Sequence, residues 1–259
     1  MKNTFKIFLA VLVTGLCSCN KQFLDRPTQN QPSTDNYYKT PGQVQGATAL
    51  LYNEVWYNWL DKAFHCIGEV YGGNMITSSG DANYGFNTYV YFTVASTDGQ
   101  DLNTWNAFYQ VAGKAAVLMN AFQQIRTDAN ASYVDPAIAE CRFFRGVAYF
   151  FIARVYGDAP IVTDPVSLAN SSDYNLPRYL QKDVLRFALE DLKAAEAGLP
   201  EDAYQPGRVT RYSAAGMEAK LYLYEGQYDS AAIKANEVIQ SSKYSLYPDY
   251  EGMFTKTEA

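Results

Sequence analysis

Apolar residues recur three and four positions apart along most of the chain, which is the spacing of one face of an α-helix. The first such stretch follows Thr40-Pro41-Gly42-Gln43, a capping-box pattern with proline at the first helical position, and predicts a helix to about residue 59. Asp135, Thr210 and Asp229 are expected to cap three later helices. The pattern therefore predicts an all-α fold, with further helices over residues 101–125, 136–156, 179–198, 210–224 and 229–241.

The predicted helix over residues 136–156 is apolar on nearly every side. A helix of this kind is buried between neighbouring helices. Phe144 and Phe151 are seven residues apart, two turns along one face, and both are expected to be buried. Trp105 and Tyr109, one turn apart on the preceding helix, are also interpreted as core residues.

The last two predicted helices have the pattern of a tetratricopeptide repeat, with small residues where two helices cross and glycine at the turn. We expect the earlier helices to pair likewise, 41–59 with 101–125 and 136–156 with 179–198. Stacked pairs bury each other's faces. The prediction is thus a tetratricopeptide-like helical-repeat scaffold with long irregular inserts, and the residues that carry the repeat pattern are Ala215, Ala219, Tyr222, Gly226, Tyr228, Ala231 and Val238.

Residues 66–100 show no helical period and combine clustered glycines with polar and aromatic side chains. A long irregular insert in a helical chain is a common place for a ligand surface. The alternative is a loop packed over helix ends, with its Tyr hydroxyls bonded to backbone, and for any single residue packing is the more frequent outcome. The candidate ligand-binding residues are Tyr71, Asn74, Asp81, Tyr84, Asn87 and Tyr89.

The N-terminal residues have the features of an export signal. Two lysines precede an apolar stretch over residues 7–13, which is too short to span a bilayer. Leu16 and Ser18 stand three positions and one position before Cys19, an arrangement that resembles the lipobox of bacterial lipoproteins. We expect residues 1–18 to be a signal peptide, Cys19 to be lipidated, residues 19–39 to form a tether and residues 40–259 to form the helical domain. The alternative is an ordinary secretory signal in which Cys19 has no role.

Charge and composition exclude several classes of function. The formal net charge of −6 argues against nucleic-acid binding, which depends on neutralising phosphates. The single histidine, His65, leaves no metal-ligand pattern, and it is interpreted as a helix-end residue. None of the 27 acidic residues is marked as a catalytic pair. We expect no catalytic residue, metal or cofactor. Cys66 and Cys141 could pair in an exported domain, but we favour two buried free thiols over a disulfide.

Four segments spread over the chain resemble the N-terminal half of the SusD/RagB proteins, which are surface nutrient-binding lipoproteins of Bacteroidetes-type bacteria. These segments are residues 23–27 (FLDRP), 139–150 (AECRFFRGVAYF), 154–162 (RVYGDAPIV) and 207–215 (GRVTRYSAA). The resemblance implies a tetratricopeptide scaffold with binding loops that sits on a TonB-dependent transporter of the SusC type. It also implies capture of oligosaccharide, or in some members peptide, at the outer face of the outer membrane.

Two other functions are considered beside nutrient binding. One is a protein-interaction scaffold that docks on the transporter without a ligand of its own, and the other is a glycoside hydrolase. The resembling family is about twice as long as this chain, and much of its ligand surface comes from the half without a counterpart here. On that interpretation the chain is a truncated product or fragment, which is expected to fold as a helical body but to bind oligosaccharide weakly or not at all.

Overall fold

The computed structural model describes residues 37–53, 56, 58–76 and 86–255. The chain divides into residues 1–37 and residues 38–259, and every element below belongs to the second unit. The predicted signal peptide, Cys19 and almost all of the predicted tether lie outside the described residues. Asp81 and Tyr84 of the predicted ligand segment also lie outside them.

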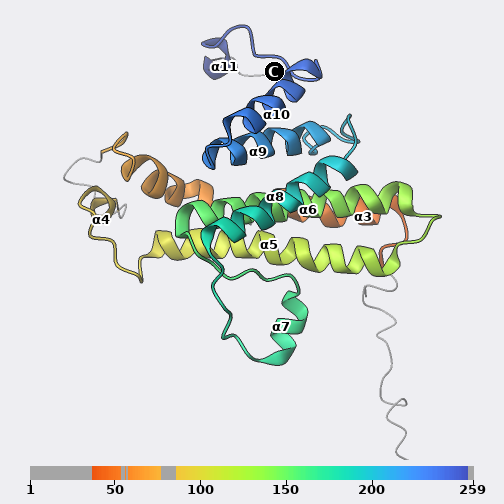
Figure 1. Cartoon of the computed structure of the whole chain (residues 1–259), viewed down its shortest axis with the longest axis horizontal. Coiled ribbons are helices and arrows are strands. Elements are labelled where there is room, and N and C mark those ends of the chain that lie inside the picture. The colour runs from red at the N-terminus through yellow and green to blue at the C-terminus, as the bar shows by residue number, and fades with distance from the viewer. Residues whose placement is uncertain (1–36, 54–55, 57, 77–85, 256–259) are drawn as a thin grey trace, which may run out of the picture. The chain divides into compact units, whose positions relative to one another are not determined.

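Helices account for all of the regular structure in the described part of the chain, apart from one isolated β-bridge between Ala159 and Tyr179, and the all-α prediction is confirmed (Figure 1). The helices are α3 (Pro41–Thr48), the 3-10 helix η2 (Ala49–Tyr52), the π-helical turns η4 (Trp59–Ala63) and η5 (His65–Val70), α4 (Asn87–Val90), α5 (Gly99–Ile125), α6 (Ala131–Tyr156), α7 (Pro165–Ser171), α8 (Gln181–Gly198), α9 (Arg211–Tyr224), α10 (Tyr228–Gln240) and α11 (Gly252–Thr255).

Two of the predicted capping residues begin helices in the structure. Thr40 and Gln43 form the complete capping box of α3, and Thr210 accepts a hydrogen bond from the backbone N–H of Ser213 at the start of α9. Another predicted cap, Asp229, lies in the first turn of α10, whose N-cap is Gln227. That part of the prediction is wrong by two residues, which is within the usual uncertainty of helix ends.

The predicted helix from Thr40 to about residue 59 is also wrong in its length. The α-helix ends at Thr48 and tightens into η2, and wide turns then run from Trp59 to Val70. Residues 66–70, expected to be irregular, are therefore helical. Their apolar side chains explain this, because Ala63, Cys66 and Val70 are all buried at helical spacing.

Helix α6 begins at Ala131, five residues before the predicted first helical position at Pro136. Val134 is fully buried, so the chain gains core contact by becoming helical before the proline. Pro136 lies inside the helix, where its missing N–H leaves out one hydrogen bond. Asp135 forms a two-pronged ion pair with Arg126, with both N–O distances at 3.0 Å, instead of capping the helix.

Helix α6 is the centre of the body and contacts α5, α8, α3 and α9. Figure 1 shows α5 and α6 lying alongside each other. The predicted pairs α6–α8 and α9–α10 are confirmed. The predicted pairing of the first helical segment with α5 is confirmed in part, because α3, η2 and η4 all contact α5, but α3 itself packs more on α6.

Burial of the two predicted core phenylalanines of α6 differs. Phe144 is buried, as predicted, but Phe151 is only half-buried, so that part of the prediction is wrong. Phe151 stacks on Phe108 of α5 with 5.3 Å between ring centroids, at the margin of the core. The two cysteines of the described residues, Cys66 and Cys141, are buried free thiols, as predicted.

Two buried ion pairs join segments that are distant in sequence. On the α6–α8 side, Arg145 donates to both carboxylate oxygens of Asp191, with N–O distances of 2.6 and 2.9 Å. Arg142 donates to the same carboxylate at 2.9 Å. The close approach of the helices is possible because Gly146 faces Ala188, where a Cβ atom would lie 2.9 Å from the Ala188 carbonyl oxygen.

The second buried pair, which we call the Arg208 clasp, joins Arg208 to Glu140 of α6 and to the first helical segment. Arg208 donates to Glu140 Oε1 at 3.2 Å, to Thr48 Oγ1 at 2.8 Å and to the Gln45 carbonyl at 2.7 Å. Tyr52 also donates to Glu140 and accepts from the backbone N–H of residue 209. This clasp explains why α3 packs more on α6 than on α5.

Candidate binding surface

The predicted ligand segment is built on a small core of its own. Cys66, Val70 and Tyr89 are buried together, and Tyr71, Phe86, Val90, Val94 and Ile67 pack against them. Turn η5 and the residue after it supply one side of this core, and α4 with its flanking residues supplies the other. The segment is thus a folded unit at one end of α5 over its described residues.

Tyr89 has its side chain fully buried in that core. Its hydroxyl donates to Asp98 Oδ1 at 2.6 Å, and the same carboxylate oxygen caps α5 by accepting from the backbone N–H of Gln100 at 2.8 Å. Burial and the hydrogen bond to Asp98 raise the pKa of Tyr89 far above its usual value. Tyr89 was expected among the ligand-binding residues, but its ring is not open to solvent and it has a packing role.

The other described candidates have different degrees of access. Asn74 is exposed just after η5, while Asn87 is partly exposed at the start of α4. Tyr71 is partly exposed, and its ring stacks on Phe92 with 5.3 Å between centroids and 15° between ring planes. Tyr71, Asn74 and Asn87 thus keep some solvent access on the described part of this segment.

Tyr91 and Phe92 are the aromatic residues that the sequence reasoning did not single out as ligand candidates. They are 70% and 72% exposed, respectively. Together with Tyr71 they form what we call the aromatic surface. One sequence feature could have indicated them. They are two adjacent aromatic residues directly after a short helix, at a position where glycine often ends a helix.

The backbone at Phe92 is held in an unusual conformation. Its φ is +54°, a region that bulky residues rarely occupy. The Thr93 N–H bonds to the Thr88 carbonyl at 2.8 Å and the Phe92 N–H bonds to the Tyr89 carbonyl at 3.3 Å, which together close α4 as a Schellman motif. Glycine is the usual residue at this position and costs nothing there, whereas phenylalanine costs about 1–2 kcal/mol.

Gly73 shows the ordinary solution to the same geometry, at the end of η5. Its φ is +75°, and the Gly73 N–H bonds to the Val70 carbonyl at 3.0 Å. The Asn74 N–H bonds to the Glu69 carbonyl at 2.9 Å, which completes the motif. Strained, exposed residues concentrate at binding sites. Phe92 is therefore the residue of this segment that most resembles part of a site.

An apolar groove of about 440 Å³ lies along α5, and none of the residues that line it belongs to the aromatic surface. Its lining includes Leu50, Val117, Leu118 and Pro165. In the described part of the chain, no group of three or more His, Cys, Asp or Glu side chains is placed to hold a metal ion. The helices of that part include none that is both long and apolar enough to cross a bilayer.

Comparison with known proteins gives a family for this arrangement. A family described as "Starch-binding associating with outer membrane" matches residues 22–223. The chain belongs to this SusD-like family. A SusD-like protein of Bacteroides ovatus is 28% identical over 260 residues, which cover 95% of this chain and 46% of that protein. The chain spans about half the length of the curated SusD-like relatives it matches.

Solved structures of SusD-like proteins share the fold. One crystallised with a xylogluco-oligosaccharide is 27% identical with a TM-score of 0.69, over 82% of this chain and 43% of that chain. A laminarin-binding SusD-like protein has a TM-score of 0.70 over 83% of this chain and 48% of that chain, and its 24% identity shows the fold alone. The helical-repeat prediction is thus confirmed at the level of the family.

Proposed function

We propose that this chain binds oligosaccharide at the aromatic surface formed by Tyr71, Tyr91 and Phe92. The observation that carries the proposal is the stacked Tyr71–Phe92 pair. The Phe92 ring in this pair is exposed, and the Phe92 backbone has a strained, left-handed conformation. A sugar ring has an apolar face that an aromatic ring can cover, and its hydroxyls can bond to nearby amides. Asn74 and Asn87 would supply such amides.

The relative crystallised with a xylogluco-oligosaccharide supports this choice of ligand class. We propose binding without catalysis and without a cofactor. Asp81 and Tyr84 remain proposed ligand residues from the sequence and lie outside the described residues. A peptide remains the alternative ligand, because aromatic rings and amides also suit an extended peptide.

The cellular role that we propose is capture of nutrient at the outer face of the outer membrane and delivery to a TonB-dependent transporter of the SusC type. The family description, starch binding in association with an outer membrane, supports it. Attachment would be through a lipid on Cys19, since the Leu16-to-Cys19 sequence resembles a lipobox. Stable anchoring needs more than one acyl chain.

Affinity electrophoresis in gels that contain xyloglucan, laminarin or starch tests the ligand, because it detects weak binding. We expect retardation in at least one polysaccharide and its loss in Phe92→Gly. Glycine suits the left-handed backbone at position 92, so this variant loses the ring without adding backbone strain. Tyr174→Ala is the matched control, since Tyr174 is similarly exposed (68%) in the loop after α7.

Three results would count against carbohydrate binding at this surface. They are an absence of retardation in every polysaccharide, equal retardation of wild type and Phe92→Gly, and equal losses in Phe92→Gly and Tyr174→Ala. Retardation that a competing peptide abolishes, but the matching oligosaccharide does not, would favour the peptide ligand instead.

The anchor is tested separately by Cys19→Ser. Without an acylated cysteine the protein should leave the membrane fraction and appear in the soluble fraction, because it lacks the acyl chains that stable anchoring needs. Fractionation should be done in cells that lack the transporter, so that docking cannot retain the protein. A Cys19→Ser protein that still sediments with outer membranes would refute lipid anchoring at this residue.

A second candidate function is a scaffold that docks on the transporter without binding a ligand. The apolar groove along α5 is the observation that favours it. Val117→Asp would place a charge in this groove, where Val117 is 40% exposed. Transporter pull-down that depends on Val117, in a protein that no polysaccharide retards, would support the scaffold over nutrient binding.

A further inference from the structure

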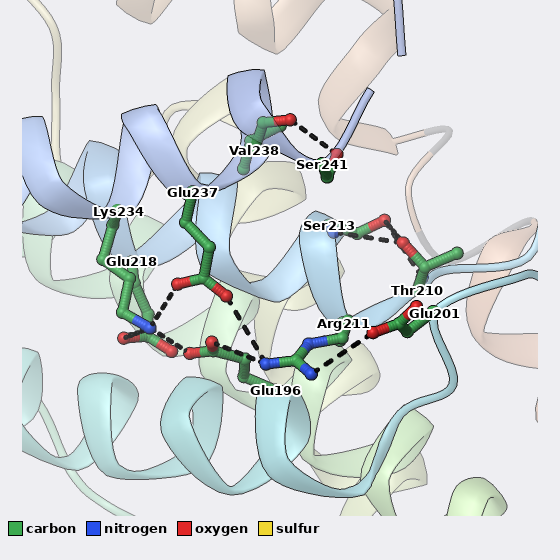
Figure 2. Close-up of polar contacts among 10 residues, drawn as sticks. All are labelled: Glu196, Glu201, Thr210, Arg211, Ser213, Glu218, Lys234, Glu237, Val238 and Ser241. Atoms are coloured by element: carbon green, nitrogen blue, oxygen red, sulfur yellow. Dashed lines mark hydrogen bonds and ion pairs between the residues drawn. The ribbon is translucent and has the colours of Figure 1, made fainter. Parts of the chain in front are cut away.

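A charged cluster joins α8, α9 and α10 at the end of the helical stack (Figure 2). Lys234 of α10 lies among three carboxylates, with its Nζ 2.5 Å from Glu196 Oε2, 3.1 Å from Glu237 Oε2 and 3.8 Å from Glu218 Oε2. Arg211 lies beside it, 3.7 Å from Glu196 and 3.5 Å from Glu237. These three carboxylates therefore outnumber the two cations that form ion pairs with them.

Glu218 is the unusual member of this cluster. Its side chain is fully buried, and neither of its carboxylate oxygens accepts a hydrogen bond from a protein donor. An ionised carboxylate in that position would be both desolvated and unsatisfied, which is costly. A protonated Glu218 would be neutral and could donate a hydrogen bond to the Glu196 carboxylate, because both carboxylates lie at the same ammonium group, with Lys234 Nζ 2.5 Å from Glu196 and 3.8 Å from Glu218.

The cluster adds ionic contacts to the packing of helix α10 on α9 and ties α10 to α8. Among the described residues of α10, only Ala231 is buried, whereas Ile233 and Ile239 are each 68% exposed. The helix packs on α9, and the ion pair between Lys234 and Glu196 connects it to α8. A change of charge at Glu218 would therefore weaken ionic contacts of a helix that buries little apolar surface of its own.

We propose that Glu218 and Glu196 share one proton, and that loss of this proton in mildly alkaline solution loosens α10 from α8 and α9. With the proton present, two carboxylates of the cluster act as a single negative charge facing Lys234. Without it, two adjacent carboxylates repel each other in a site that excludes water.

The charges around Glu218 come from each packed element. Helix α8 contributes Glu196 and Lys193, and α10 contributes Lys234 and Glu237. Arg211, at the start of α9, and Glu201, in the segment before it, complete the cluster at 3.7 Å from each other. Hydrogen bonds to Glu196 and Glu237 outweigh burial and raise the pKa of Lys234, so the lysine stays charged throughout the relevant range.

Burial first, and then the hydrogen bond with Glu196, raises the pKa of Glu218 to about 8. In the unfolded chain the pKa of a glutamate is about 4.3. The folded state therefore holds a proton that the unfolded state has lost. This contribution to stability is complete below about pH 4.3, declines as the pH rises and is gone above about pH 8.

Glu196 titrates in a different range. Burial would raise its pKa, but hydrogen bonds with Lys234 and Glu218 lower it overall. Its contribution is present above the unfolded pKa and lost only in acid. Between pH 5 and pH 9, the difference between wild type and a variant that does not titrate at position 218 therefore reports on Glu218 and not on Glu196.

Glu218→Gln tests the proposal, because glutamine keeps the shape and the donor of the protonated acid but does not titrate. Glu190→Gln is the matched control, an exposed glutamate on α8. Hydrogen exchange followed by mass spectrometry should show equal protection of α10 peptides in wild type and Glu218→Gln at pH 6. At pH 9, wild type and Glu190→Gln should exchange faster in α10 than Glu218→Gln does, with α6 peptides as the internal reference.

Global stability should follow the same proton. Relative to Glu218→Gln, the unfolding equilibrium constant of wild type should rise by up to about tenfold per pH unit between pH 5 and pH 8. Equal pH profiles of wild type and Glu218→Gln would overturn the proposal. So would a Glu218→Gln protein that fails to fold at pH 6, where it should mimic the native acid.

Carbon-13 NMR of the wild-type glutamate carboxyl groups gives an independent reading that needs no variant. One carboxyl resonance should titrate above pH 6.5. If every glutamate resonance titrates below pH 5.5, the shared proton does not exist and the proposal is wrong.

Discussion

The α6–α8 interface and the α8–α10 end of the stack each bury a carboxylate, but they stabilise it in different ways. Asp191 is 2% exposed and accepts three N–H hydrogen bonds from Arg145 and Arg142. Glu218 is fully buried and accepts none from a protein donor. At Asp191 the balancing charge is permanent, because arginine does not lose its proton at any ordinary pH.

The difference lies in what each interface contributes besides charge. Helices α6 and α8 meet at Gly146 and bury several apolar residues around the ion pair, so the pair is enclosed by a tight core. Helix α10 buries little apolar surface, and the cluster forms a larger share of its attachment. A buried carboxylate with fixed partners suits a permanent interface, whereas one that depends on a proton suits an interface that responds to solution conditions.

The largest expected effect is that of Asp191→Ala. It leaves Arg145, with a 6% exposed side chain, as an uncompensated buried charge, so the free energy of unfolding should fall by about 3–5 kcal/mol. Urea denaturation followed by circular dichroism measures it. Asp183→Ala is the control on the same helix, because its ion pair with the largely exposed Arg186 should contribute at most about 1 kcal/mol. Equal losses in both variants would mean that the buried pair adds nothing special.

Gly146→Ala should have the next largest effect. The added Cβ would lie 2.9 Å from the Ala188 carbonyl and 3.0 Å from Leu192, so α6 and α8 must separate, at a cost of about 1–3 kcal/mol. Gly216→Ala on α9 meets nothing within 4 Å and should stabilise by about 0.5–1 kcal/mol through better helix propensity. Thermal melting of the two variants should therefore shift in opposite directions. Shifts in the same direction would contradict close packing at Gly146.

The smallest effect is expected for Ile239→Ser on α10. Ile239 is 68% exposed, and surface substitutions usually change stability by no more than about 0.5 kcal/mol. Leu192→Ala on α8, which is fully buried, should cost about 2–5 kcal/mol for a comparable loss of apolar side chain. Chemical denaturation of both variants sharpens the contrast between the interfaces. A loss above 1 kcal/mol for Ile239→Ser would mean that this face of α10 is covered in solution.

Local patterns predicted much of the scaffold, because caps and apolar spacing act within a few residues. Helices α5, α8 and α9 begin and end within two residues of the predicted positions. The position of α3 could not be predicted this way. It depends on Arg208, which lies 160 residues from Thr48, and no short-range pattern marks that contact.

The candidate site shows the same limit at the level of single side chains. Tyr89 and Phe92 are aromatic residues of one polar, glycine-rich segment, and nothing in composition separates them. The structure does, because Asp98 accepts from the Tyr89 hydroxyl and draws that ring inward, while a helix-ending turn carries Phe92 outward. No residue type marks either contact, since phenylalanine occupies the left-handed position where glycine is usual, so the sequence could indicate the segment but not its exposed members.

The Arg208 clasp has a consequence for the order in which the chain can fold. Its bonds to Gln45, Thr48 and Glu140 span up to 163 residues, so they close the longest loops of the body. Contacts of such separation form slowly, because the entropy of a long loop is lost before any contact compensates it. During synthesis from the N-terminus, α5 and α6 can associate well before Arg208 exists. Helix α3, the first helix of the described residues to be made, is therefore among the last of them to reach its final place.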